Sequence, residues 1–149
     1  MRIRAVVVNY NGGDDILDCL RALLASQALT RDLDVVVVDN GSVDGSAERI
    51  EAELPQVRLV RSPGNLGYSA INQVVEDLTG VDLVAIVNPD AVVAPDCLAV
   101  LAAALAEDAG LGAACPLITL SGDYREIRVE LEGPAGGSID LLDVEGADR

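Results

Sequence analysis

Four short, mainly apolar runs of strand length recur along the chain. They cover residues 3–8, 35–38, 57–60 and 83–87. Their apolar residues follow one another instead of alternating with polar ones, which indicates strands buried on both faces of a parallel sheet. This pattern favours an α/β fold.

Helix-length segments separate these runs. Apolar side chains recur at helical spacing over residues 15–25, and residues 47–54 follow Ser46, which we predict to be an N-cap. Two more helices are predicted over residues 67–78 and 95–106, the last with Pro95 at its first position. Alternating strands and helices predict a Rossmann-like three-layer α/β sandwich, with a mostly parallel central sheet and helices on both faces.

The composition favours one domain with an aliphatic core. The chain has 149 residues, of which 50% are hydrophobic, with three Tyr and no Phe or Trp. This length suffices for one ordinary domain. The cysteines, Cys19, Cys97 and Cys115, are far apart in apolar surroundings, so we interpret them as small core residues of a reducing compartment and not as a disulfide framework.

The charged residues exclude several classes of function. The formal net charge is −15, and all ten basic residues are Arg. Nucleic-acid binding is excluded because no basic stripe is present. The absence of His removes Ser-His-Asp and Cys-His nucleophile systems and the commonest zinc ligand. Any general base must therefore be a carboxylate.

The N-terminus carries no targeting signal that we recognise. Its apolar run over residues 5–8 is too short for the core of a signal peptide. The longest other apolar run, residues 97–106, is far shorter than the roughly 20 residues that span a bilayer. We therefore expect a cytoplasmic protein without a transmembrane segment.

Polar clusters follow three of the predicted strands. They are Asn9-Tyr10-Asn11-Gly12, residues 39–42 (Asp-Asn-Gly-Ser), and Asn88-Pro89-Asp90. Tight turns also favour Asn, Asp and Gly, so each cluster alone is better explained as a turn. Ligands of open α/β sheets bind beyond the carboxyl ends of the strands, and three clusters in such positions predict one shared crevice.

The usual phosphate-binding motifs are missing. No G-x-G-x-x-G follows the first strand, and a Walker motif is impossible without Lys. A nucleoside diphosphate would bring about two negative charges into an acidic crevice, which requires a divalent cation. Asp90 is the natural holder of Mg²⁺ or Mn²⁺, because hard cations take oxygen ligands and Mg²⁺ often uses one or two carboxylates together with phosphates.

Four segments resemble the successive signatures of the family 2 nucleotide-sugar glycosyltransferases of the GT-A fold. In order they are VVVNYNGGDDILDCLRALLAS, DVVVVDNGSVDGSAERI, VRLVRSPGNLGYSAINQ and LVAIVNPDAVVAPDCLAVL. The resemblance covers about residues 1–120, and it is greatest to the rhamnosyltransferase-like subgroup. The resemblance implies an inverting transfer of a sugar from a nucleotide-diphosphate sugar to an unidentified acceptor.

The resemblance also implies roles for individual residues. Val8 and Tyr10 would line the nucleoside pocket, with Asn9 and Asn11 in the same cluster. Asp39 or Asn40 would contact a pyrimidine or similar base.

A second set of residues would meet the rest of the donor. Asn65, Gly67 and Tyr68 match the segment that approaches the ribose and phosphates. Asn88 and Asp90 match the metal motif, whose first carboxylate is Asn here.

Structural explanations stay open for three of these residues. Tyr10 would then cap the core, Tyr68 would pack under its own helix, and Gly67 would only begin that helix. Asp90 has the clearest functional interpretation, because a carboxylate after a buried strand and a Pro turn has little structural reason to be there.

No residue stands in a recognisable base motif. In the family the base lies well beyond the metal motif, so Asp123 and Glu126, and further Glu130 and Glu132, are the local candidates. We expect residues 1–120 to form the nucleotide-sugar-binding core and residues 121–149 a short strand and loop extension.

Two hypotheses follow. The chain is a metal-assisted glycosyltransferase acting on a glycan or lipid-linked acceptor, peripheral at the inner membrane surface. Alternatively, it is a donor-binding module or subunit that needs a partner chain, or a homo-oligomer, to supply the acceptor site.

Overall fold

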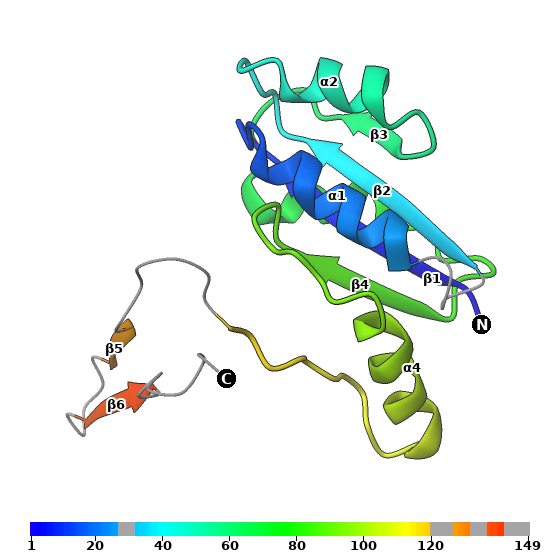
Figure 1. Cartoon of the computed structure of the whole chain (residues 1–149), viewed down its shortest axis with the longest axis vertical. Coiled ribbons are helices and arrows are strands. Elements are labelled where there is room, and N and C mark those ends of the chain that lie inside the picture. The colour runs from blue at the N-terminus through cyan, green and yellow to red at the C-terminus, as the bar shows by residue number, and fades with distance from the viewer. Residues whose placement is uncertain (27–31, 120–126, 132–136, 142–149) are drawn as a thin grey trace. The chain divides into compact units, whose positions relative to one another are not determined.

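The computed structural model describes residues 1–26 and 32–119, together with two strands over residues 127–131 and 137–141 (Figure 1). The chain divides into two compact units, Met1–Pro116 and Leu117–Arg149. The first unit holds the predicted sheet and its helices. Its elements are β1 (Ile3–Asn9), α1 (Asp15–Ala25), β2 (Leu33–Asp39), α2 (Ser46–Glu53), β3 (Arg58–Arg61), the 3₁₀ helix η2 (Gly67–Ile71), α3 (Asn72–Val75), β4 (Leu83–Val87) and α4 (Cys97–Glu107).

The four strands form one parallel sheet in the order β3-β2-β1-β4. The register of β1 and β2 pairs Asn9 with Asp39, so the two strands end level. All four predicted strands are therefore confirmed, with ends that differ by at most two residues.

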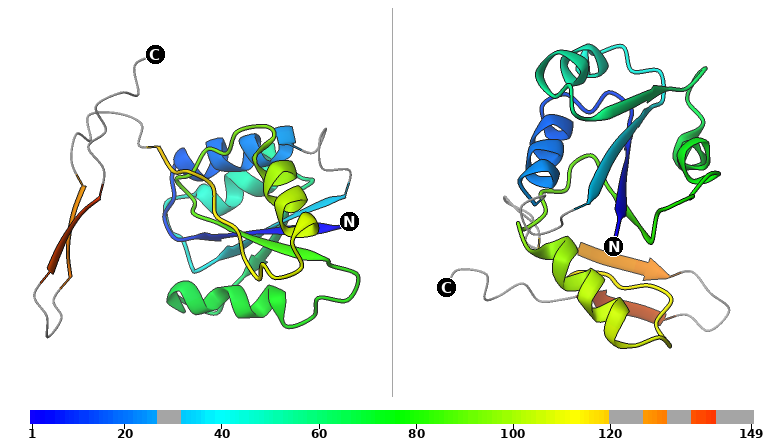
Figure 2. Two further views of the ribbon diagram at one scale, coloured as in Figure 1. Left: turned by 90° about the horizontal axis from the view of Figure 1, so that it is seen from below. Right: turned by 90° about the vertical axis from the view of Figure 1, so that its right-hand side faces the viewer.

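Helices cover both faces of this sheet (Figure 2). Alternate strand residues face opposite sides. Ala5, Val7, Val35 and Val37 pack with residues of α1, α2 and α4, whereas Val6, Val36 and Val38 pack with residues of η2 and α3. This is the predicted three-layer arrangement, and both faces of the central strands are buried.

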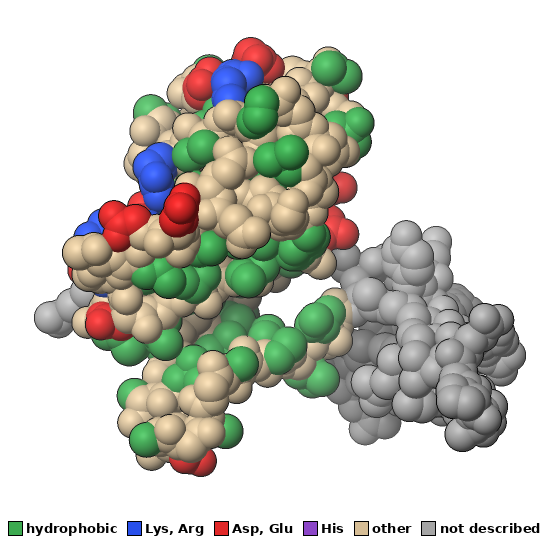
Figure 3. Space-filling model, turned by 180° about the vertical axis from the view of Figure 1, so that it is seen from behind, with side chains coloured by type: hydrophobic (Ala, Val, Ile, Leu, Met, Phe, Trp, Pro, Cys, Tyr) green, Lys and Arg blue, Asp and Glu red, His purple; other side chains and the backbone are tan. Residues whose placement is uncertain are grey.

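The six arginines of the first unit whose side chains are described are all paired with acidic side chains. Nitrogen–oxygen distances to the nearest carboxylate lie between 2.7 and 4.0 Å for Arg2, Arg4, Arg21, Arg49, Arg58 and Arg61. On the face in Figure 3, basic side chains accordingly lie beside acidic ones. Among these six arginines, none is therefore an uncompensated cation.

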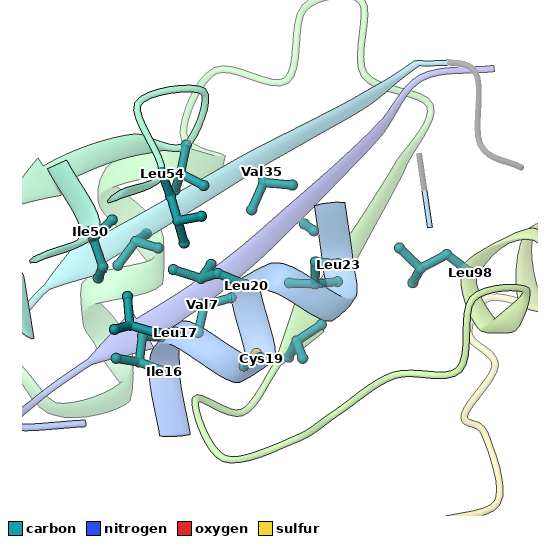
Figure 4. Close-up of a cluster of buried hydrophobic side chains, with 14 of the residues drawn as sticks. Val7, Ile16, Leu17, Cys19, Leu20, Leu23, Val35, Ile50, Leu54 and Leu98 are labelled. Atoms are coloured by element: carbon teal, nitrogen blue, oxygen red, sulfur yellow. The ribbon is translucent and has the colours of Figure 1, made fainter. Parts of the chain in front are cut away.

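The core between α1 and the sheet is aliphatic, as the composition predicts. Ile16, Leu17, Leu20 and Leu23 of α1 are fully buried and lie against Val7 of β1 (Figure 4). Helix α1 coincides with the predicted residues 15–25, because its apolar residues occupy one face at helical spacing.

The helices that follow β2 and β4 begin differently from the prediction. Ser46 is the first residue of α2, and its cap position is taken by Gly45, whose φ is +82°. The Ser46 hydroxyl donates to Asp44 Oδ1 at 2.6 Å, so it caps no backbone group of its helix. Helix α4 begins at Cys97, two residues after Pro95.

The predicted helix over residues 67–78 is shorter and in two parts, η2 and α3. Arg4 of β1 explains where it stops. Its Nη1 donates to the carbonyl oxygens of Val74 and Asp77, at 2.9 Å each. These are acceptors that a continuing helix would use for its own backbone.

The cysteines only partly match the expectation of core residues. Cys19 is buried, Cys97 is half-buried and Cys115 is exposed, and all three are free thiols. Cys115 lies in the irregular segment after α4, where no element of the first unit covers it. The absence of a disulfide among them agrees with the sequence prediction.

The second unit contains an antiparallel pair of strands, β5 (Ile127–Leu131) and β6 (Gly137–Leu141). Strand β5 is the short strand expected within residues 121–149. The loop expected in the rest of this extension contains a second strand, β6, where Ile139 and Leu141 alternate with Ser138 and Asp140 in the period of a strand. The pair forms a sheet of its own and does not extend the four-stranded sheet.

No helix within the described residues is both long enough and apolar enough to cross a bilayer.

Candidate functional site

The polar clusters after β1, β2 and β4 converge at the carboxyl edge of the sheet. The three strands are adjacent and parallel, with β1 in the middle. Asn9 at the end of β1 bonds to Asp39 at the end of β2, and Asn88 follows β4 directly. The three clusters therefore lie at one edge of the sheet, whereas the shared crevice stays a prediction.

Asn9 is the centre of a buried network. Its side chain is 0% exposed, and its Nδ2 lies within hydrogen-bonding distance of Asp39 Oδ1 (2.9 Å), Ser46 Oγ (2.9 Å) and Ser42 Oγ (3.1 Å). Its Oδ1 accepts from the backbone N–H of Gly12 at 3.2 Å. One side chain thus joins β1, β2, the start of α2 and both intervening loops. Within the described residues, its polar atoms are used inside the protein.

Asp39 is engaged in the same way. The carboxylate is 2% exposed, and its Oδ2 accepts from the backbone N–H groups of Gly41 and Ser42 at 3.2 Å each. Gly41 has φ +82°, a conformation that favours glycine. Asp39 therefore shapes the turn that follows β2. Its predicted contact with a base stays a prediction.

The loops after β1 and β2 are joined at their tips. Asn11, which has φ +54°, accepts the N–H of Val43 on its Oδ1 at 2.8 Å and donates its own N–H to Ser42 Oγ. The N–H of Gly13 donates to Asp44 Oδ2 at 2.9 Å. Hydrogen bonds from the Ser46 hydroxyl and from backbone N–H groups lower the pKa of Asp44, which is exposed. The rim of the site is therefore a preformed pair of loops.

Asn40 positions the loop that precedes η2. This side chain is buried, and its Nδ2 donates to the carbonyl of Gly67 at 2.8 Å while its Oδ1 accepts from the N–H of Leu66 at 3.5 Å. Asn65 accepts the N–H of Gly67 on its Oδ1 at 2.8 Å. The end of β2 thus holds the segment that carries Tyr68.

Asn88 and Asp90 stand on the turn after β4, and both are exposed. The hydroxyl of Tyr68 donates to Asn88 Oδ1 at 2.6 Å. The buried thiol of Cys19 donates to the carbonyl of Asn88 at 3.3 Å. Burial, assisted by the negative charge of Asp90, raises the pKa of that thiol to about 12. Helix α1 therefore supports this turn from inside the core.

The two tyrosines of the described region face outward at this edge. Tyr10 is 52% exposed and Tyr68 is 59% exposed. The structural explanations for them, a cap on the core for Tyr10 and packing under a helix for Tyr68, do not fit these exposures. Val8 is half-buried beside the smaller cluster under η2 and α3. Gly67 begins η2 with φ +60°, so its structural explanation is met.

The base candidates cannot be placed at this edge. Asp123, Glu126 and Glu132 lie outside the described residues, and Glu130 lies on β5 in the second unit. Within the described residues, no group of three or more Cys, Asp or Glu side chains could enclose a metal ion by itself.

Comparison with known proteins identifies the family. The family model for glycosyl transferase family 2 matches residues 5–134, which is most of the chain. The chain belongs to glycosyl transferase family 2. The match begins in β1, continues through the three polar clusters and extends beyond the resemblance found in the sequence.

Relatives with names share the same region. The chain is 32% identical over 124 residues to an N-acetylglucosaminyl-diphospho-decaprenol L-rhamnosyltransferase of Mycobacterium tuberculosis, covering 76% of this chain. It is 31% identical over 108 residues to an uncharacterized glycosyltransferase of Mycoplasma pneumoniae, covering 68% of this chain. The chain spans only 40% and 36% of these two relatives.

Solved structures confirm the GT-A fold. The mannosyltransferase PcManGT from Pyrobaculum calidifontis, in complex with GDP-Man and Mn²⁺, is 32% identical with a TM-score of 0.60, over 70% of this chain and 32% of that one. S. aureus TarS 1-349 is 26% identical with a TM-score of 0.56, over 72% of this chain and 33% of that one. The GT-A core is therefore what this glycosyltransferase family 2 chain shares with longer proteins.

Proposed function

We propose that this family 2 chain binds a nucleotide-diphosphate sugar at the carboxyl edge of its sheet and takes part in transferring the sugar to a glycan or lipid-linked acceptor, with inversion. The observation that carries the proposal is the convergence of Asn9, Asp39 and Asn88 at that edge, in a family 2 chain. The rhamnosyl- and mannosyltransferase names of its relatives point in the same direction.

The donor would lie across the exposed rim of this edge. The buried Asn9 network shapes the rim, whereas the exposed rings of Tyr10 and Tyr68 offer faces for a base or a sugar. We assign the nucleoside to the side of Val8, Tyr10 and the turn at Asp39–Asn40. The ribose and phosphates then meet the loop that carries Tyr68.

A divalent cation fits the residues at the turn after β4. The six arginines of the first unit whose side chains are described are each paired with a carboxylate, so none of these six is free to neutralise a diphosphate. Asp90 would supply one exposed carboxylate ligand to Mg²⁺ or Mn²⁺, together with the phosphates of the donor. Such a cation would act as a Lewis acid on the departing diphosphate.

Inverting transfer also needs a carboxylate that takes a proton from the acceptor hydroxyl. We propose Asp123, Glu126, Glu130 and Glu132 as the set in which to seek it. In this proposal, residues 1–120 form the core that binds the donor, and residues 121–149 form a short extension of that core. The lipid-linked name of the mycobacterial relative supports a cytoplasmic position at the membrane surface.

The second candidate is a donor-binding module without turnover, or a subunit completed by a partner chain. This candidate is favoured because the chain spans only part of the length of the relatives that it matches. Under this alternative the sheet edge binds the donor, but the proton acceptor is supplied from elsewhere.

Calorimetry with UDP and GDP, with Mn²⁺ or with EDTA, tests the donor site. We expect Asp90→Ala to weaken metal-dependent binding roughly tenfold or more, because a charge-assisted ligand contributes about 1.5–3 kcal/mol. Asp96→Ala is the matched control, since Asp96 is also exposed but stands at the start of α4. Equal affinity in Mn²⁺ and EDTA would refute the metal site.

A turnover assay separates the two candidates. With radiolabelled donor and a lipid-linked acceptor, the module should bind donor but lose the roughly 10²–10⁴-fold that a positioned base contributes. Transfer at about 1 s⁻¹ or faster by the chain alone would favour the enzyme. Single amide substitutions at the four carboxylates would then identify its base.

A further inference from the structure

Tyr68 and Asn88 form a short hydrogen bond between two exposed side chains. The phenolic O–H donates to Asn88 Oδ1 at 2.6 Å, across 20 positions of sequence. Both side chains are exposed, so the need to satisfy a buried polar group does not explain this bond. We therefore ask how this bond restricts the orientation of the two side chains.

The Tyr68 end of the bond is held by the protein interior. Buried Asn40 bonds to both Leu66 and Gly67, directly before the tyrosine. Ala70 and Ile71 follow it and are buried against the sheet. The tyrosine therefore starts from a backbone position that the end of β2 determines.

The backbone of Asn88 is held separately. Its carbonyl accepts from the Cys19 thiol at 3.3 Å and from the N–H of Ala91 at 3.1 Å. What remains free is the rotation of its side-chain amide. The hydrogen bond from the Tyr68 hydroxyl removes that freedom. It also links the loop after β3 to the turn after β4, although β3 and β4 are not neighbours in the sheet.

The two ends of an amide differ, because Oδ1 accepts hydrogen bonds and Nδ2 donates them. With Tyr68 bonded to Oδ1, Asn88 Nδ2 has no partner in the described part of the chain. The two N–H donors of this amide belong to a residue that lies two positions before Asp90. The arginines Arg21, Arg49 and Arg61 are paired with carboxylates, so they offer no unpaired cation at this edge.

We propose that Tyr68 is a positioning residue, which orients Asn88 so that its Nδ2 donates to the diphosphate of the bound donor. This inference rests on the proposed function. In this proposal the two residues of the turn have different roles. Asp90 provides the carboxylate for the cation, and Asn88 provides hydrogen bonds that an aspartate at the same position could not donate.

A double-mutant cycle on the 149-residue chain tests the proposal, with UDP and GDP as probes in the presence of Mn²⁺. We expect Tyr68→Phe and Asn88→Ala each to weaken binding about 3- to 10-fold, the range for one or two hydrogen bonds. The double variant should bind no more weakly than Asn88→Ala, because Tyr68 acts through Asn88.

Ser69→Ala is the matched control on the same helix. Its hydroxyl donates to the carbonyl of Leu66 at 2.6 Å, so the variant removes a comparable bond within η2 without touching Asn88. We expect its affinity for both nucleotides to equal that of the unaltered chain.

A ligand-free readout comes from ¹⁵N NMR of the Asn88 side-chain amide, identified by its loss in Asn88→Ala. The signal should move in Tyr68→Phe and stay in Ser69→Ala. An unmoved signal, unchanged affinity in Tyr68→Phe, or losses that multiply in the double variant would overturn the positioning role alone. If the unaltered chain binds neither UDP nor GDP, the proposed function fails and this inference with it.

Discussion

Replacing Asn9 by alanine should destabilise the whole first unit, although the residue carries no charge and ends a strand. The substitution removes the shared partner of Asp39, Ser46 and Gly12. Asp39 is 2% exposed and Ser46 is 1% exposed, so water cannot readily replace the lost amide. The carboxylate keeps its two backbone donors but loses its bond to the end of β1.

The magnitude follows from these contacts. A hydrogen bond to a charged group contributes about 1.5–3 kcal/mol, and a neutral one about 0.5–1.5 kcal/mol. The free energy of unfolding should therefore fall by about 2–4 kcal/mol. Because domains are stable by only about 5–15 kcal/mol, this is a large part of the total.

Urea unfolding followed by far-UV circular dichroism measures the loss as a shift of the midpoint. Asn72→Ala is the control, because Asn72 is exposed and makes no side-chain hydrogen bond within the described residues. A change below about 0.5 kcal/mol in Asn9→Ala, equal to that of the control, would refute the network as a source of stability.

Further predictions concern other buried contacts. Gly12→Ala should unfold at lower urea, by about 1–3 kcal/mol, because a Cβ would lie 2.6 Å from Asn9 Oδ1. Arg4→Met should cost about 2–3 kcal/mol in the same assay, since it removes the closer of the two arginines beside Asp34 and the donor to two carbonyls; no shift would contradict a stabilising role for these bonds. Cys19 has a pKa raised to about 12 from an ordinary 9.0, so its contribution is complete below pH 9 and is lost as pH rises towards 12. Cys19 should lower the free energy of unfolding by about 1.4 kcal/mol between pH 8 and pH 10, and Cys19→Ala should remove this part of the fall. Iodoacetamide at pH 8 should label exposed Cys115 well before Cys19 in the folded protein.

The hydrophobic pattern along the chain was sufficient to predict the strands of the sheet and helix α1. The run that became β4 is apolar from its first residue to Val87, its last, and polar Asn88 follows, so its bounds could be read directly. The apolar face of α1 repeats at helical spacing, and its predicted range is the observed one. Because carboxyl ends of parallel strands meet at one edge, the shared position of Asn9, Asp39 and Asn88 was also predictable.

The roles of those residues were not predictable, because they depend on partners distant in sequence. Asn9 looks like a ligand contact in the chain, yet its amide faces Asp39 and Ser46, which lie 30 and 37 positions away. The helix over residues 67–78 is cut short by Arg4, more than 60 positions earlier. Local propensity carries no information about such contacts.

The amino-acid sequence by itself therefore determined the layers, the strand ends and the kinds of polar group gathered there. Only the tertiary structure decided which of these groups face inward, as Asn9 and Asp39 do, and which have no hydrogen-bond partner within the described residues, as is the case for the Asp90 carboxylate and the Nδ2 of Asn88. The physical reason is that burial and hydrogen bonding are properties of pairs. A side chain at a strand end points to solvent or to a partner according to what the neighbouring strand and helix place beside it.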